Sequence, residues 1–321
     1  MNIRMIALAA LSAGSALATD ATLLGLVPPD AKVVAGIRVT QAIASPLGQF
    51  VLSHLPAGGD GFDKMMGATG FDPRHDVSEI LIASSDPNNH HAGLVAVRGV
   101  FDPARIESAA AAHGSAKSSV LGVTVFASDA AQVALALPDA TTAVFGDLDS
   151  VKAAIRRYRN KARLGDDLQN KLRTASLDSS GVPNDVWFVT LAPLSEMIPK
   201  QSAAGGENHQ NMNMFQAVQQ ASAGIRFTAE DVRLAAQLVA RSDKDAQSIA
   251  DVVRFLVTML QSNRQKSQMA GAMASLLDTL NLSTNANVTQ VALALPEAQV
   301  EQLINSLQQH KRVGEPVPPS H

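Results

Sequence analysis

A nine-residue stretch occurs twice in this chain and constrains its fold more than any other feature. Residues 132–140 read QVALALPDA, and residues 290–298 read QVALALPEA. Each copy alternates large and small apolar residues and then reaches a proline, which has no N–H to donate to a sheet ladder and so ends a strand. A repeat of this length, with one acid exchanged for another, predicts two similar halves.

The same order of elements is expected on both sides of the midpoint: strand, helix, hairpin, helix, strand. In the first half the expected strands are 32–39, 77–84, 92–99, 120–128, 132–137 and 142–146. In the second half they are 185–191, 225–229, 232–241 and 290–295. This order is the split βαβ arrangement related to the ferredoxin-like fold. The sequence therefore predicts an α+β protein of two related halves with a mainly antiparallel sheet.

Helix starts are marked by capping residues. Ser45-Pro46 and Asp102-Pro103 each place an N-cap before a proline at the first helical position, and Ser242 with Asp245 resembles a capping box. After Ser242, apolar residues at helical spacing predict a buried stripe through Leu260. Helical spacing also occurs in 149–159, 214–222 and 269–280, and again after Pro296. The polar stretch 201–211 is expected to be a loop.

These patterns divide the chain into five parts. We expect a signal peptide over 1–18, a first α+β half over 19–160, a linker with a short helix over 161–183, a second α+β half over 184–311 and a disordered tail over 312–321. The pattern leaves open whether the halves share one sheet or form two domains.

The first eighteen residues predict export. Arg4 precedes an apolar run from Met5 to Leu17, and Ala16-Leu17-Ala18 fits the small-x-small rule for cleavage after Ala18. A short buried helix is the alternative, and the run is too short to span a bilayer. The chain has no cysteine, so an exported form would rely on core burial without disulfides. The mature protein is expected to be soluble, in the periplasm or outside the cell.

Composition argues against several classes of function. Hydrophobic residues make up 46% of the chain and the net charge is −3, which supports a large core and gives no overall basic excess for nucleic acid. Walker, G-x-G-x-x-G, G-x-S-x-G and H-E-x-x-H motifs are absent from the sequence. We therefore assign no catalytic residues and no cofactor.

Histidines give the metal candidates: His90 and His91 in the predicted hairpin loop, with His75 and Asp86 near in sequence. Imidazoles suit zinc, copper or nickel, but adjacent histidines on a strand point to opposite faces, and the spacing is unspecific. Polar decoration of a loop is the competing interpretation. Asp147 and Asp149 resemble the start of a calcium loop that lacks its glycine and final glutamate, so Asp149 is better interpreted as a helix cap.

Two other residue types gather locally. A basic run could meet an anionic lipid headgroup, nucleic acid or an acidic partner, although cations in the last turns of a helix ordinarily face water. Its members are Lys152, Arg156, Arg157, Arg159, Lys161 and Arg163. Methionines could form an adaptable groove, although at helical spacing they more often fill a core; these are Met212, Met214, Met269 and Met273.

Three segments carry a family resemblance: LVPPDAKVVAGIRV near the start, then GFDPRHD before a strand, then LVAVRGVFDPARI. Together they resemble exported bacterial proteins of unknown function, of a type associated with acidobacteria. The resemblance would cover most of the mature chain, and it implies export and a duplicated α+β build. Its motifs are starts and stops of elements, so it carries no site residues across.

The leading hypothesis is an exported, non-enzymatic scaffold that binds a protein partner or an apolar ligand at the junction of its halves. One alternative is a periplasmic hydrolase in which His54, His75 or His113 meets a carboxylate in a cleft. Another is a cell-envelope structural protein that self-associates through a strand edge. The sequence does not give the oligomeric state.

Overall fold

The computed structural model describes residues 19–54, 67, 69–89, 93–128, 132–197, 216–264, 271 and 274–302. The expected signal peptide, the loop over 201–211 and the tail over 312–321 lie outside these residues. So do His90, His91 and the four methionines of the predicted groove, and for His54 only the backbone is described.

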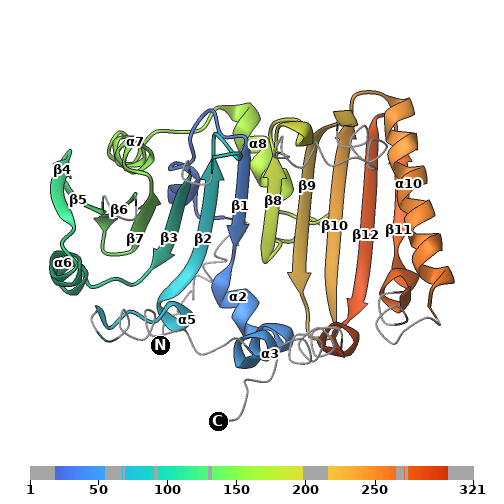
Figure 1. Ribbon diagram of the computed structural model, residues 1–321, viewed down its shortest axis with the longest axis horizontal. Coiled ribbons are helices and arrows are strands. Elements are labelled where there is room, and N and C mark those ends of the chain that lie inside the picture. Colours follow the sequence, from blue (N-terminus) through green and yellow to red (C-terminus); the bar gives the residue numbers. More distant parts are fainter. Residues whose placement is uncertain are drawn as a thin grey trace, which may run out of the picture.

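The strands of the described chain form one twelve-stranded antiparallel sheet (Figure 1). Its order is β11-β12-β10-β9-β8-β1-β2-β3-β7-β6-β5-β4, so the two expected halves share a continuous sheet. The α+β class with a mainly antiparallel sheet is confirmed. The strands are β1 Val33–Ile37, β2 Val77–Ser84, β3 Leu94–Gly99, β4 Ala116–Val120, β5 Val123–Ser128, β6 Val133–Asp139, β7 Thr142–Gly146, β8 Val186–Thr190, β9 Val218–Phe227, β10 Asp231–Ala240, β11 Asn281–Asn285 and β12 Val288–Pro296.

The two halves meet where β1 pairs with β8. The pairing is antiparallel and centred on Ala35 opposite Phe188. At the next position Gly36 lies opposite Trp187, and a Cβ added to Gly36 would come within 2.3 Å of the indole nitrogen. The Trp187 side chain is 1% exposed. A glycine on β1 therefore makes room for the tryptophan of β8, and this contact joins the two sets of strands.

Outward from this seam the strands follow a similar order on both sides. β1 is followed by β2, β3 and then β7, whereas β8 is followed by β9, β10 and then β12. The two copies of the nine-residue stretch do not occupy matching places in this order. The copy in β6 lies between β7 and β5, and the copy in β12 lies between β10 and β11. The duplication stays a prediction.

Helices cover both faces of the sheet, and those that follow Ser45, Asp102 and Ser242 begin at the caps expected from the sequence. Asp102 accepts hydrogen bonds from the backbone of Ala104 and Arg105, Ser45 from Gly48, and Ser242 from Asp245. Each cap satisfies backbone N–H groups that a helix start leaves unpaired. The helices are α1 Ala21–Leu24, α2 Val39–Ala44, α3 Pro46–His54, α5 Pro73–Asp76, α6 Pro103–Ala112, α7 Leu148–Arg159, α8 Asp166–Ala175 and α10 Asp243–Ser262, with short 3-10 turns at Leu194–Glu196 and Leu277–Thr279.

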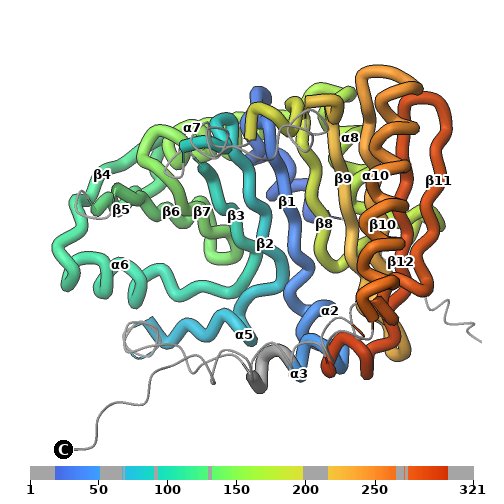
Figure 2. The backbone as a smooth tube through the Cα atoms, turned by 45° about the vertical axis from the view of Figure 1, so that its right-hand side comes forward, coloured from blue at the N-terminus to red at the C-terminus, as the bar shows by residue number. Residues whose placement is uncertain are grey.

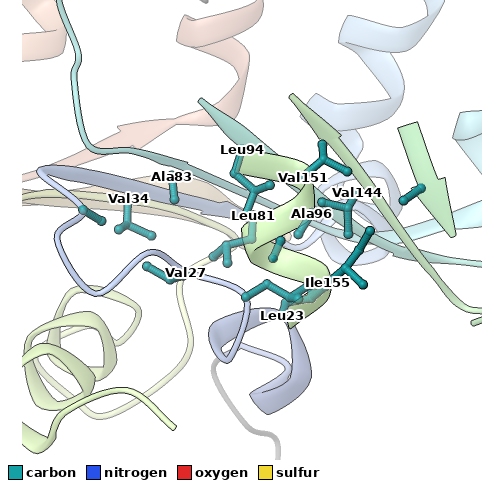
Figure 3. Close-up of a cluster of buried hydrophobic side chains, with 14 of the residues drawn as sticks. Leu23, Val27, Val34, Leu81, Ala83, Leu94, Ala96, Val144, Val151 and Ile155 are labelled. Atoms are coloured by element: carbon teal, nitrogen blue, oxygen red, sulfur yellow. The ribbon is translucent and has the colours of Figure 1, made fainter. Parts of the chain in front are cut away.

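The largest core cluster lies between α1, α7, α8 and one face of the sheet (Figure 3). Leu23, Val34 and Ile155 are fully buried there, although they are far apart in sequence. Trp187 belongs to the same cluster, so this side of the seam is filled.

Three strands differ from the sequence expectation. The helical spacing over 214–222 led to a wrong prediction, because 218–227 form strand β9 between β8 and β10. The residues Ala221 to Gly224 are small and have weak intrinsic preferences, so pairing on both sides decides their conformation. The edge strands β4 and β11 were missed, since their sequences AKSSV and NLSTN are polar and lack apolar alternation. In consequence, the predicted strand 120–128 is divided by a turn at Leu121 and Gly122.

Helix α10 is present as expected, but its apolar stripe is only partly covered. Ala246, Ile249 and Ala250 in its first two turns are buried. Further along, Leu256 and Met259 are each 43% exposed. The sheet ends at β11 on this side (Figure 1), and the described chain places no further strand beneath the later turns.

Among the described residues, no helix is both long enough and apolar enough to cross a membrane.

We predict that Gly36→Ala destabilises the protein by about 1–3 kcal/mol, because the added methyl group overpacks against Trp187. Urea-induced unfolding followed by fluorescence of Trp187, the one tryptophan of the chain, measures the change. Gly67→Ala is the matched control, since a Cβ at that exposed position meets nothing within 4 Å. Equal unfolding midpoints for Gly36→Ala and the unmodified protein would contradict the role given to this contact.

Candidate functional site

An apolar cavity of about 300 Å³ lies between α6 and the strands β5, β6 and β7. Both α6 and these strands are at the β4 end of the sheet (Figure 2). The cavity lining is mainly aliphatic and aromatic, and the titratable side chain among it is His113. The lining residues are Thr69, Phe71, Phe101, Ile106, Ala109, Ala110, His113, Ser115, Phe126, Ser128, Val133, Ala134, Leu135, Leu137, Ala143 and Phe145.

Helix α6 forms the roof of this cavity with small side chains. Its Ile106, Ala109 and Ala110 were expected to face inward, and all three line the cavity. All three side chains are only half-buried. The methyl groups of Ala109 and Ala110 are too small to fill the space between the helix and the sheet. Larger side chains at positions 109 and 110 would fill this space, so the two alanines leave the cavity open.

Alternate residues of three neighbouring strands form its floor. Side chains two apart on a strand lie on the same face. Leu135 and Leu137 of β6 therefore lie beside Phe126 of β5 and Phe145 of β7. One wall of the cavity is the stacked pair Phe71 and Phe101, whose ring centroids are 5.4 Å apart.

The cavity is open to solvent on one side. Val133 is 50% exposed and Phe145 is 40% exposed, although both are apolar and both line it. Polar lining side chains are short: Thr69, Ser115 and Ser128, besides His113. An open cavity with this lining can accept a hydrocarbon group, and its described lining residues include no Asp, Glu, Lys or Arg to fix an ionic one.

The same face of the sheet carries an apolar row beyond the cavity. Residues paired directly across neighbouring strands place their side chains side by side on one face. Through successive pairs, this row crosses eleven strands and ends at the edge strand β4, where the paired residue is Lys117. One member of the row, Ile82, is 41% exposed. Its members are Leu282, Val291, Ala236, Ala223, Phe188, Ala35, Ile82, Val95, Phe145, Leu135 and Phe126.

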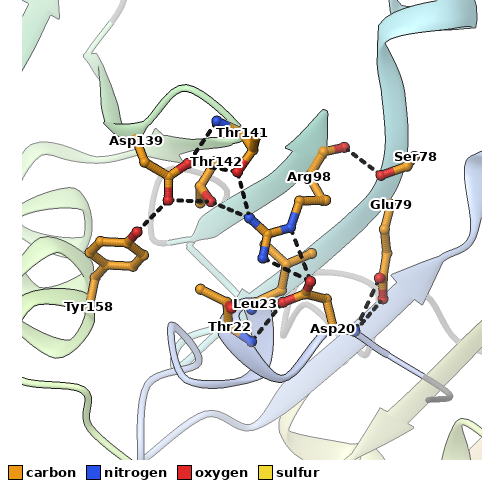
Figure 4. Close-up of polar contacts among 10 residues, drawn as sticks. All are labelled: Asp20, Thr22, Leu23, Ser78, Glu79, Arg98, Asp139, Thr141, Thr142 and Tyr158. Atoms are coloured by element: carbon orange, nitrogen blue, oxygen red, sulfur yellow. Dashed lines mark hydrogen bonds and ion pairs between the residues drawn. The ribbon is translucent and has the colours of Figure 1, made fainter. Parts of the chain in front are cut away.

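A polar network lies on the opposite side of β3 and β7 (Figure 4). Arg98 of β3 donates from Nε and Nη2 to the Asp20 carboxylate at 3.0 and 2.8 Å, and from Nη1 to the hydroxyl of Thr142 at 2.8 Å. The Thr142 hydroxyl in turn donates to Asp139, which also accepts a hydrogen bond from Tyr158 of α7. The network therefore ties the segment before α1 to β3, the β6–β7 turn and α7.

These contacts shift the pKa values of the acids in opposite directions. Burial acts to raise the pKa of Asp20, but the hydrogen bonds and charge of Arg98 outweigh it, so this pKa is lowered. The pKa of Asp139 is also lowered, because hydrogen bonds from Tyr158 and Thr141 outweigh its burial. Burial raises the pKa of Glu79, and the Asp20 charge adds to the effect. Sequence reasoning missed the network, since its members are spread over residues 20–158.

The predicted basic run lies beside a second, larger hollow. Arg157, Arg159, Lys161 and Arg163 line a space of about 710 Å³ together with residues of α1. Arg157 is engaged in structure, because it donates to the Leu26 carbonyl at 2.7 and 3.0 Å. The side chains of Arg159, Lys161 and Arg163 are exposed, as expected for cations at the end of a helix.

The histidine candidates do not converge in the described chain. His75 lies on α5, is largely exposed, and contacts Asp72 three residues earlier at 3.1 Å. His113 is in the cavity, and the described contacts give its side chain no carboxylate partner. No group of three or more metal-ligating His, Asp or Glu side chains occurs among the residues with described positions. The cap predicted at Asp149 is wrong by two residues: Asp147 is the N-cap of α7 and accepts a hydrogen bond from the backbone N–H of Ser150, whereas Asp149 lies within the first turn.

We predict that Arg98→Met destabilises the protein by about 1–3 kcal/mol at pH 7, because it leaves the Asp20 carboxylate without its charged donor. The folded-state pKa of Asp20 lies below its unfolded value. The pair therefore contributes stability above the ordinary Asp pKa of about 3.9 and loses it as the pH falls through the folded pKa.

Denaturant unfolding of both proteins between pH 7 and pH 3 tests this prediction, and the difference between them should shrink toward pH 3. Arg105→Met is the control, because its pair with Asp102 is mostly exposed and contributes little. A difference that stays constant across this range would show that Arg98 acts by packing alone.

Comparison with known proteins adds information about the fold. No protein-family model and no curated protein matches the sequence. Crystal form III of TP0453, a treponemal protein, superposes with a TM-score of 0.53 at 11% identity, covering 90% of this chain and 98% of that one. Crystal form IV of TP0453 gives a TM-score of 0.50 at 10% identity, covering 88% and 95%. At such identities the likeness shows a shared fold and nothing about activity.

Proposed function

We propose that this protein is an exported, non-enzymatic scaffold that binds an apolar ligand in the cavity between α6 and strands β5–β7. The observation that carries the proposal is the lining of this cavity, in which four phenylalanines and four larger aliphatic side chains occur, with no carboxylate, lysine or arginine among the described lining residues. Its volume of about 300 Å³ falls at the lower end of the range for small-molecule sites. The proposed site lies inside the first half rather than at the junction.

The exposure of its apolar side chains supports the proposal. Leaving Val133 and Phe145 partly in water costs free energy in the empty protein, at about 25 cal/mol for each Å² of apolar surface. A hydrocarbon group in the cavity would cover that surface and recover the cost. The apolar row that continues through Val95 to Ile82 extends the same surface, so the ligand class that fits is an elongated one.

The other hollows fit an apolar ligand less well. The space beside α1 and α7 is bordered by four cationic side chains. Two hollows in the second half, of about 230 and 260 Å³, contact Asp178 and Asn184, and Asp178 forms an ion pair with Arg226 at 2.6 Å. A hydrocarbon group in any of these would desolvate polar side chains without giving them partners.

The alternative of a hydrolase requires a histidine and a carboxylate in one cleft. His113 is at the cavity, whereas the described pair of His75 and Asp72 is on the surface of α5. Self-association through a strand edge finds little support in the described edges. β4 is short and carries Lys117, and β11 carries Asn281, Ser283 and Asn285, features that discourage edge pairing.

Ala110→Trp tests the proposed function. The indole fills the cavity, so binding of the neutral fluorescent probe N-phenyl-1-naphthylamine should weaken at least about tenfold, or roughly 1.4 kcal/mol. Fluorescence titration of the probe measures the dissociation constant, and 1-decanol should compete with it.

Ala111→Trp is the matched control, because Ala111 is the next residue of α6, is exposed and does not line the cavity. This variant should bind the probe as the unmodified protein does. Equal binding by the two variants, or no saturable binding by the unmodified protein, would rule the site out.

A further inference from the structure

The Glu79 carboxylate of β2 is half-buried, and the start of the described chain lies directly beside it. Its two oxygens accept the backbone N–H of Asp20 at 3.1 and 3.3 Å (Figure 4). The carboxylate of Asp20 is also near, close enough for its charge to raise the pKa of Glu79. Two acidic groups therefore share a partly desolvated site.

The arginines near this site form their ion pairs with other carboxylates. Arg98 gives its charged contacts to Asp20, and Arg38 lies 3.7 Å from Asp185. Arg38 acts on Glu79 only through its more distant charge. Within the described part of the chain, no lysine or arginine forms an ion pair with Glu79. A buried carboxylate is ordinarily paired, so this site lacks a positive charge.

Thr19, the residue before Asp20, also lies near the Glu79 carboxylate. It is 5% exposed, and its hydroxyl is close enough to lower the pKa of Glu79 without meeting hydrogen-bond geometry. Three covalent bonds separate the Thr19 nitrogen from the Asp20 nitrogen, so the two atoms lie within about 3.8 Å of each other. The Asp20 nitrogen is already hydrogen-bonded to Glu79.

We propose that cleavage of the Ala18–Thr19 bond creates the missing cation, and that the new Thr19 α-ammonium group binds the Glu79 carboxylate in the mature protein. The bond is the one at which the small-x-small pattern of Ala16 and Ala18 places cleavage. The inference rests on the export proposed above and not on the identity of the ligand.

The chemistry is hydrolysis by a leader-processing peptidase. The C–N bond between Ala18 and Thr19 breaks, the oxygen of water goes to the Ala18 carboxyl group, and the Thr19 nitrogen becomes a primary amine. An α-amino group has an ordinary pKa of about 7.7–8.0, so it carries a positive charge at pH 7. Because Thr19 is buried in the folded chain, cleavage precedes the docking of this segment.

The new ion pair would fix the segment on which the first core cluster depends. Asp20 is the N-cap of α1 and the partner of Arg98. Leu23, Leu26 and Val27, which follow at once, are fully buried. Removal of the leader would thus add the Thr19 α-ammonium group that completes the polar network.

The first test is the N-terminus of the exported protein. The full chain is expressed in an exporting bacterium, and intact-mass analysis with N-terminal sequencing should show a chain that begins at Thr19. A mature chain that begins at any other residue overturns the inference. That result does not bear on the cavity proposal, which the probe titration tests separately.

The second test is a double-mutant cycle of processing and Glu79→Gln, with stability measured by denaturant unfolding at pH 7. Processed protein should have an unfolding equilibrium constant about tenfold lower than unprocessed full chain, which corresponds to about one unit of α-amine pKa. In Glu79→Gln, which keeps the shape and the acceptor oxygen, processing should bring no such gain. An equal gain in both backgrounds overturns the inference.

A third measurement covers the case in which unprocessed chain does not fold. Acylation of the Thr19 α-amine in folded, processed protein by a succinimidyl ester should be slower by about tenfold than in the free peptide Thr-Asp-Ala-Thr, because an ion-paired amine is protonated. Glu79→Gln should restore the rate, and Glu107→Gln, whose carboxylate pairs with Lys117 on the surface, should not. Equal rates in the unmodified protein and Glu79→Gln overturn the inference.

Discussion

The contact between Gly36 and Trp187 is the constraint on which the rest of the structure depends. The Trp187 indole occupies the space that a Cβ on the directly opposite Gly36 would fill, so the ring fits there because Gly36 has no side chain. The ring is buried with Val34, Leu81 and Val189 in the largest core cluster. Burial of so large a side chain is worth several kcal/mol, which is a large part of the net stability of a typical domain. Two sets of strands thereby become one sheet.

The sheet then has two unlike faces. Large aliphatic side chains from α1, α7 and α8 close one face against β1, β2, β3 and β7, as the cluster around Leu23, Val144 and Ile155 shows (Figure 3). On the other face α6 brings alanines to its contact with the strands. Close packing is achieved where opposing side chains have complementary volumes, and a void remains where they do not. The filled core receives Val151 and Ile155 from α7 and Leu172 from α8, whereas α6 brings one large side chain, Ile106, with Ala109 and Ala110 to the cavity.

Polar contacts complete the closed face beside the start of α1. Asp20, Arg98, Asp139 and Tyr158 come from four elements, and each holds a neighbour in position. Such networks are worth most when every member is satisfied, because an unpaired buried charge costs more than a pair contributes. Glu79 is the member whose charge is not matched among these groups. From this imbalance we propose that the α-ammonium group which cleavage would create at Thr19 supplies the missing charge.

The sequence by itself determined the local features of this protein. The pairs Asp102-Pro103 and Ser45-Pro46 marked helix starts, and the apolar runs over 77–84 and 92–99 marked a hairpin, because these structures depend on residues within a few positions of one another. Tertiary structure decided what depends on distant partners. It drew 218–227 into a strand, added the polar edges β4 and β11, and separated the two QVALALP copies into different places in the sheet. It also assembled the cavity and the network of Asp20 and Arg98, because pairing and burial bring together residues whose spacing in the chain carries no trace of their contact.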